Sequence, residues 1–107
     1  MSNSFRPTGN TVRIDATTAS ASAQVTNNTA ASSYRLHNGG ATEVYIAFAP
    51  NSAPTAAIPA VGTPANGWPL HANATQVITA NANGFFAVIT TVAGPIPVFI
   101  TPGEAVL

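Results

Sequence analysis

Apolar residues in this chain recur at every second position, and this period of two is the feature that most restricts its fold. The segment 44–48 places its valine, isoleucine and phenylalanine on one face, and 96–101 places Ile96, Val98 and Ile100 on one face. Side chains alternate between the two faces of a strand, so the pattern predicts half-buried strands. The stretch 16–23 lacks Gly and Pro, but its Ser and Thr content argues against a helix.

Turn residues separate the segments that carry this pattern. We expect about seven short strands, at 11–15, 21–26, 34–37, 44–48, 75–80, 84–91 and 96–101. The segment 84–91 is apolar on both faces, which predicts burial on both sides. Short strands, polar turns and no convincing helix predict an all-β fold, a small antiparallel β-sandwich or barrel with a jelly-roll-like topology among the alternatives.

The most specific local prediction is a hairpin around residues 38–42. This Asn-Gly-Gly-Ala-Thr segment is turn chemistry, because Asn and Gly tolerate a positive φ. A hairpin across it aligns the apolar faces of 34–37 and 44–48, with Leu36 opposite Val44. The same register sets His37 opposite Glu43 as a polar pair on the solvent side.

Residues 50–73 differ from the rest, because they contain five of the nine prolines. No regular element is expected at that spacing, so we predict one long Pro-rich loop within a single domain of residues 11–107. Residues 1–10 are expected to be a flexible N-terminal arm that orders on a partner. Four apolar side chains are candidates to hold the loop against the domain: Ile58, Val61, Trp68 and Leu70.

Charge is scarce, at 6% of 107 residues with a formal net charge of zero. An ordinary domain has roughly a quarter charged residues, so this chain has weak electrostatic protection against self-association and is expected to form a homo-oligomer. Three arginines without lysine argue against nucleic-acid binding. No apolar run approaches the roughly 20 residues of a membrane span, and no signal peptide is recognisable.

The few ionisable residues form no motif that indicates catalysis. The acids are Asp15, Glu43 and Glu104, and the histidines are His37 and His71. No nucleophile-elbow motif marks a serine beside a histidine, so we expect a protein that is not an enzyme and needs no cofactor. A metal site of His37, Glu43 and His71 is conceivable, but the spacing fits no compact ligand motif and none is predicted.

Contacts with other molecules are instead expected from a few apolar, aromatic and cationic residues. The candidates are Phe5, Arg6, Pro7, Tyr45, Trp68 and Leu70. Trp68 has two open interpretations, packing within its own protomer or across a subunit boundary. Together with Tyr45 it also suggests an aromatic platform for a sugar, which would make the chain a carbohydrate-binding module.

Four segments resemble one group of proteins: Thr11–Ile14, Tyr34–Ala41, Val44–Phe48 and Phe99–Val106, the last with its Thr-Pro-Gly-Glu sequence. The chain is similar to small structural proteins of tailed bacteriophages and prophages. The resemblance implies a capsid decoration (cement) protein with a β-sandwich or β-tulip body. Such a protein is made in the host cytoplasm, binds the major capsid protein on the outer head lattice of the virion, and is often a trimer. A tail, collar or head-fibre component is the alternative within this resemblance.

Overall fold

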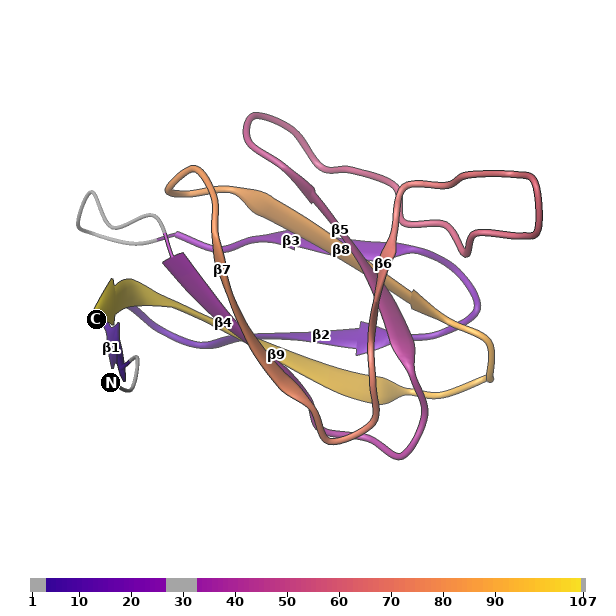
Figure 1. Cartoon of the computed structure of the whole chain (residues 1–107), viewed down its shortest axis with the longest axis horizontal. Coiled ribbons are helices and arrows are strands. Elements are labelled where there is room, and N and C mark those ends of the chain that lie inside the picture. Colours follow the sequence, from indigo (N-terminus) through magenta and orange to yellow (C-terminus); the bar gives the residue numbers. More distant parts are fainter. Residues whose placement is uncertain (1–3, 27–32, 107) are drawn as a thin grey trace.

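A computed structural model describes residues 4–26 and 33–106, which form nine strands and no helix (Figure 1). The strands are β1 (Ser4–Pro7), β2 (Val12–Ala16), β3 (Ala21–Gln24), β4 (Ser33–Asn38), β5 (Val44–Ala49), β6 (Trp68–Leu70), β7 (Thr75–Thr79), β8 (Phe85–Thr90) and β9 (Ile96–Val106). They make two antiparallel sheets around one core, which confirms the predicted all-β sandwich. Seven of the strands overlap the predicted segments, although β9 runs five residues past the predicted end at 101, and β1 and β6 are additional. None of the described residues belongs to a helix that is long and apolar enough to cross a membrane.

The long strand β9 is the centre of the first sheet, which we call sheet A. One of its edges pairs with β2 and then β1, and the other pairs with β4, which pairs in turn with β7. Pro102 lies between the stretches that pair with β2 and β1, and its carbonyl accepts a hydrogen bond from the Thr8 N–H on that side. The backbone N and O of one strand residue point to the same side of the strand. The Pro102 nitrogen, which has no N–H, therefore faces the gap between β2 and β1, where no ladder partner needs it. Pro97 similarly lies one residue past the last pair between β4 and β9.

The second sheet, sheet B, has the order β3-β8-β5-β6. Strand β6 lies inside the Pro-rich segment 50–73, so the prediction of no regular element there is wrong at these three residues. Successive residues of a strand turn their backbone N–H and C=O groups toward opposite neighbouring strands. The hydrogen bond from the Val25 N–H to the Gly84 carbonyl shows which residues of β8 face β3, and the registers extend this alternation through β5 to β6. This alternation turns the backbone of Trp68 and Leu70 toward β5 and that of Pro69 outward. Proline is tolerated at such an edge because no ladder partner needs its N–H.

Side chains from the inner faces of both sheets form the core, and an aromatic group lies at its centre. The Tyr34 ring is 4.9 Å from the Phe86 ring and 6.1 Å from the Phe48 ring, centroid to centroid. The buried Tyr34 hydroxyl donates to the Asn81 carbonyl and accepts from the Gly84 N–H, which attaches the 81–84 turn to the core. A Cβ on Gly84 would lie 2.1 Å from the Phe48 ring, so only glycine fits there.

The predicted hairpin between 34–37 and 44–48 does not form. Strand β4 pairs with β7 and β9 in sheet A, whereas β5 pairs with β6 and β8 in sheet B. His37 is therefore opposite Thr75 and Phe99, and not opposite Glu43. Two strands with matching apolar faces can lie side by side or face each other across a core, and the alternation does not distinguish these arrangements. Leu36 and Val44 are both fully buried because they meet the same core from opposite sheets.

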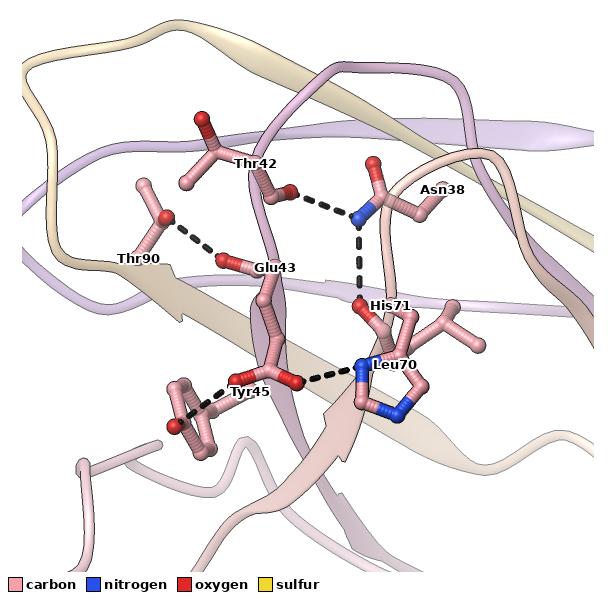
Figure 2. Close-up of polar contacts among 7 residues, drawn as sticks. All are labelled: Asn38, Thr42, Glu43, Tyr45, Leu70, His71 and Thr90. Carbon is pink, nitrogen blue, oxygen red and sulfur yellow. Dashed lines mark hydrogen bonds and ion pairs between the residues drawn. The ribbon is translucent and has the colours of Figure 1, made fainter.

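Asn38 holds the turn that carries the chain from one sheet to the other (Figure 2). Its side chain is buried, and its Nδ2 donates to the carbonyls of Thr42 (2.8 Å) and Leu70 (3.1 Å). Its Oδ1 accepts from the Gly40 N–H at 2.9 Å. An asparagine side chain can form hydrogen bonds with backbone groups that would otherwise need backbone partners. Asn38 therefore stabilises a turn between the two sheets instead of a hairpin.

The first part of the Pro-rich loop covers the outer face of sheet B. Ala56 is buried against Ala47 of β5 and Ala87 of β8, and its N–H donates to the Ser20 Oγ at 2.9 Å. The methyl side chains of the strand residues leave room for the backbone of the loop. Strand β8 is thereby largely enclosed on both faces, as predicted.

The residues expected to hold this loop behave differently from one another. Leu70 is buried in the core, and Trp68 and Ile58 are half-buried. Val61 is fully exposed in a turn closed by a bridge between Ala60 and Thr63. The loop between β5 and β6 projects from the sandwich (Figure 1). The prediction that Val61 anchors the loop is therefore wrong, and the anchor that the sequence did not reveal is Ala56.

The N-terminal segment also differs from the flexible arm expected for residues 1–10. Strand β1 pairs with the end of β9, and Arg6 forms an ion pair of 2.7 Å with Glu104. Phe5 lies over Gly103, where a Cβ would come within 2.6 Å of the Phe5 ring. Residues 4–8 are thus bound to the domain by strand pairing, and residues 1–3 of the expected arm lie outside the described residues.

Candidate functional site

A small polar cluster lies where β5 and β6 meet (Figure 2). The Glu43 carboxylate accepts from the Tyr45 hydroxyl at 3.0 Å, and its second oxygen is 2.6 Å from the His71 Nδ1. The Glu43 carbonyl accepts from the Thr90 hydroxyl at 2.8 Å, which ties the cluster to β8. Glu43 thus pairs with His71, where the sequence suggested His37; the His37 Nδ1 contacts the Thr75 hydroxyl.

The cluster resembles part of a catalytic triad in one respect, because a carboxylate on Nδ1 orients an imidazole. The His71 side chain is 80% exposed, and among the described residues only Glu43 forms an ion pair or hydrogen bond with its ring. A nucleophile on the other ring nitrogen is therefore missing from this part of the chain. His37 lies on the other sheet, and no three potential metal ligands come together within 4–26 and 33–106.

The cluster has one clear electrostatic effect. The hydrogen bond from Tyr45 to Glu43, together with partial burial and the carboxylate charge, raises the pKa of the Tyr45 hydroxyl above its ordinary value of 10.0. Each of these influences favours the neutral phenol over the phenolate. The arrangement therefore favours the protonated Tyr45 hydroxyl. It also fixes the Tyr45 ring beside the end of the 50–73 loop, where a Cβ on Gly67 would lie 3.3 Å from the Tyr45 Cβ.

An open pocket of about 510 Å³ lies between the edge strands β6 and β7. Its lining is mostly apolar and consists of Phe48, Trp68, Gln76, Ile78, Thr79 and Ala80. The Trp68 Nε1 donates to the Gln76 Oε1 at 3.1 Å, which links the edge of sheet B to the edge of sheet A. Trp68 thus packs against its own core, but its ring also borders a hollow that is open to solvent.

Trp68 and Tyr45 do not form the single aromatic platform that a sugar site would need. Trp68 is opposite the core residue Ile46, and Tyr45 is opposite Pro69. Residues directly opposite each other share a face, so the two aromatic rings project from opposite faces of sheet B. This geometry removes the arrangement on which the carbohydrate-binding alternative rested.

A further candidate surface is the outer face of sheet A, which we call the open face. Its side chains alternate with the core residues of β2, β4, β7 and β9. Ser33, at the start of β4, is buried, and the other side chains of this face are not. They are Thr11, Arg13, Asp15, Arg35, His37, Thr75, Val77, Thr79, Pro97, Phe99 and Thr101. Apart from Phe5, which lies over Gly103 at one end, no described segment of the chain covers this face, in contrast to the outer face of sheet B.

The open face has an aromatic centre between two polar neighbours. Phe99 is half-buried on β9; the His37 ring lies 6.4 Å away on one side, and the Arg13 guanidinium lies 6.0 Å from the ring centroid on the other. Arg13 is paired with Asp15 at 2.7 Å. Arg35 is exposed and has no hydrogen bond or ion pair among the described residues, so one cation on this face is available for a partner.

The candidate interface residues from the sequence lie in three separate places. Phe5, Arg6 and Pro7 are on β1 at the end of sheet A, and Tyr45 is on sheet B beside the loop. Trp68 borders the pocket, and Leu70 is 4% exposed, which makes it a core residue and not an interface residue. The sequence missed Phe99, Arg35 and Val77, whose only signal is an outward position in a strand.

No family model matches this chain, and no curated protein or solved structure matches it. The resemblance to phage structural proteins therefore rests on the four sequence segments alone. Three of these segments include residues of β2, β4 and β9, the strands that contribute most of the open face.

Proposed function

We propose that this protein is a virion structural protein, a capsid decoration protein that binds the major capsid protein on the outer head lattice and assembles as a homo-oligomer, with a trimer as the expected form. The open face carries the proposal. It offers an uncovered sheet surface with three charged groups, two of which are paired with each other. The sequence resemblance supplies the class of partner.

The chemistry of the open face suits a contact that is repeated many times over a lattice. Threonine, valine and phenylalanine side chains lose little hydration energy on contact, whereas unpaired charges would cost much more. Each contact can be weak, because one attached edge of an oligomer raises the effective concentration of the next. We infer that the partner surface is correspondingly poor in charge and presents a carboxylate opposite Arg35.

The copy number of the protein in purified virions tests this function. Quantitative mass spectrometry against the major capsid protein should give a number equal to the capsid copy number or to a simple fraction of it set by the lattice. A tail protein from the same particles is the internal control for a low-copy component. A count near that control would assign the chain to the tail, collar or head fibre, and absence from virions would refute a structural role in the particle.

A further inference from the structure

The free edges of the two sheets are not equally protected against pairing with another strand. Pro69 faces outward on β6, β1 ends at Pro7, and β2 presents Arg13 and Asp15 on its outer side. Strand β3 packs beside β2. Strand β7 (Thr75–Thr79) has no proline and no charged residue, the two features that most often block an exposed edge.

The backbone of β7 has hydrogen-bonding groups available on its outer side. The Asn38 N–H donates to the Ala74 carbonyl, so the alternating ladder turns every second residue after Ala74 toward β4. Thr75, Val77 and Thr79 therefore point their N–H and C=O groups away from the sheet. No described residue forms a hydrogen bond with these backbone groups.

The sequence of β7 is complementary to itself in an antiparallel arrangement. Reversing Thr-Gln-Val-Ile-Thr about its central valine places Thr75 opposite Thr79 and Gln76 opposite Ile78. No charge meets a like charge, and threonine and valine are residues that favour strands. Val77, at the centre, is 45% exposed and is one of the few large apolar side chains on the surface.

The pocket lies next to the same edge, on its inner side. Gln76 and Ile78 point inward from β7 and line the pocket with Trp68. If a second β7 pairs about Val77, Ile78 of the second copy comes to lie beside Gln76, where it extends the apolar lining toward Trp68. The two pockets would then face each other across one continuous inner surface.

We propose that two copies of this chain pair antiparallel through β7, with Val77 opposite Val77 of the second copy, so that their A sheets join into one. The contact is isologous, because the same strand is used on both sides of a twofold axis. It goes beyond the proposed function: it does not require a capsid, and in a trimer it would link one trimer to the next.

Cysteine substitution tests the pairing and its register, because the natural chain has no cysteine. Hydrogen-bonded opposite residues have Cα atoms about 5.5 Å apart, which lies inside the roughly 4.4–6.8 Å range of disulfides. The variant Val77→Cys should therefore form a covalent dimer under mild oxidation. In the matched control Thr79→Cys, the two cysteines would lie roughly 14 Å apart along the strands and should not cross-link.

The double variant with Thr75→Cys and Thr79→Cys should regain the cross-link, because residue 75 faces residue 79 of the second copy. Paired thiols should react on the order of a hundredfold faster than the control, since their effective concentration is millimolar.

Val77→Lys should shift the untreated protein to a smaller size in light scattering while its thermal unfolding changes little. Equal cross-linking in Val77→Cys and Thr79→Cys, or none in either, would overturn the proposal.

Discussion

The outer faces of the two sheets illustrate two ways of using the same secondary structure. On sheet B the middle outward positions of the two central strands are alanines, Ala47 and Ala87, and the chain covers them with its own loop. On sheet A the corresponding positions hold larger side chains such as Arg35 and Phe99, and no described segment covers them. The small side chains of Ala47 and Ala87 thus coincide with the part of sheet B on which the loop packs.

The prolines of the loop help to explain why sheet B is covered. Each proline restricts φ in the unfolded chain as well as in the folded one, so a Pro-rich segment loses less entropy when it settles on a surface. The loop can therefore be held by a small contact at Ala56 and one hydrogen bond to Ser20. The open face has no such segment nearby in the described chain.

The largest expected effect comes from enlarging a side chain on the covered face. Ala87→Leu adds three carbon atoms under the loop, where the residue is fully buried, and overpacking of this kind costs about 1–3 kcal/mol. Urea denaturation should show that loss in the free energy of unfolding. Thr79→Leu on the open face is the control, and it should change the free energy by no more than about 0.5 kcal/mol. Equal losses in both variants would mean that the two faces do not differ as described.

A second prediction concerns attachment to the capsid. Arg35→Gln should weaken binding to heads that lack this protein by about tenfold, or about 1.4 kcal/mol, because it removes the unpaired cation of the open face. Co-sedimentation with purified heads measures the bound fraction. Arg6→Gln removes the same charge from β1, where Arg6 is already paired with Glu104, and should bind almost normally. A larger loss in Arg6→Gln would transfer the contact to the N-terminal strand.

The smallest effect is a pH dependence confined to the covered side. Because the pKa of Tyr45 is raised in the folded protein, the neutral phenol contributes stability that is present below about pH 10 and is lost as the pH rises through the raised pKa. Glu43→Gln should lower the pKa of Tyr45 in an ultraviolet absorbance titration, with Tyr45→Phe identifying its signal. Unfolding measured over the same pH range should become less pH-dependent in Glu43→Gln. An unchanged titration would show that Glu43 does not control this hydroxyl.

Much of the fold follows from the period of two in the sequence. Val44, Ile46 and Phe48 point inward as the alternation requires, and Asn38 begins a turn. The partner of each strand did not follow, because alternation identifies a face and not a neighbour. Strand β6 was missed because Pro69 argues against a strand unless its backbone is known to face outward.

The candidate sites were harder to predict, because they depend on which sheet each strand joins. The contact between Glu43 and His71 joins residues from the turn between β4 and β5 and from the end of β6. The open face becomes visible only once β2, β4, β7 and β9 are known to be neighbours. One signal was present in the sequence: Ala47 and Ala87 stand at outward positions among large apolar residues, and such small residues indicate that another segment packs on them.

Hydroxyl-radical footprinting of the free and virion-bound protein tests the central claim most directly. Phe99 on the open face and Tyr45 on the opposite sheet are both aromatic and half-buried, so they are matched reporters of the two sides. Attachment through the open face should protect Phe99 from oxidation and leave Tyr45 unchanged. Protection of Tyr45 with Phe99 still reactive would show that the covered side, and not the open face, binds the capsid.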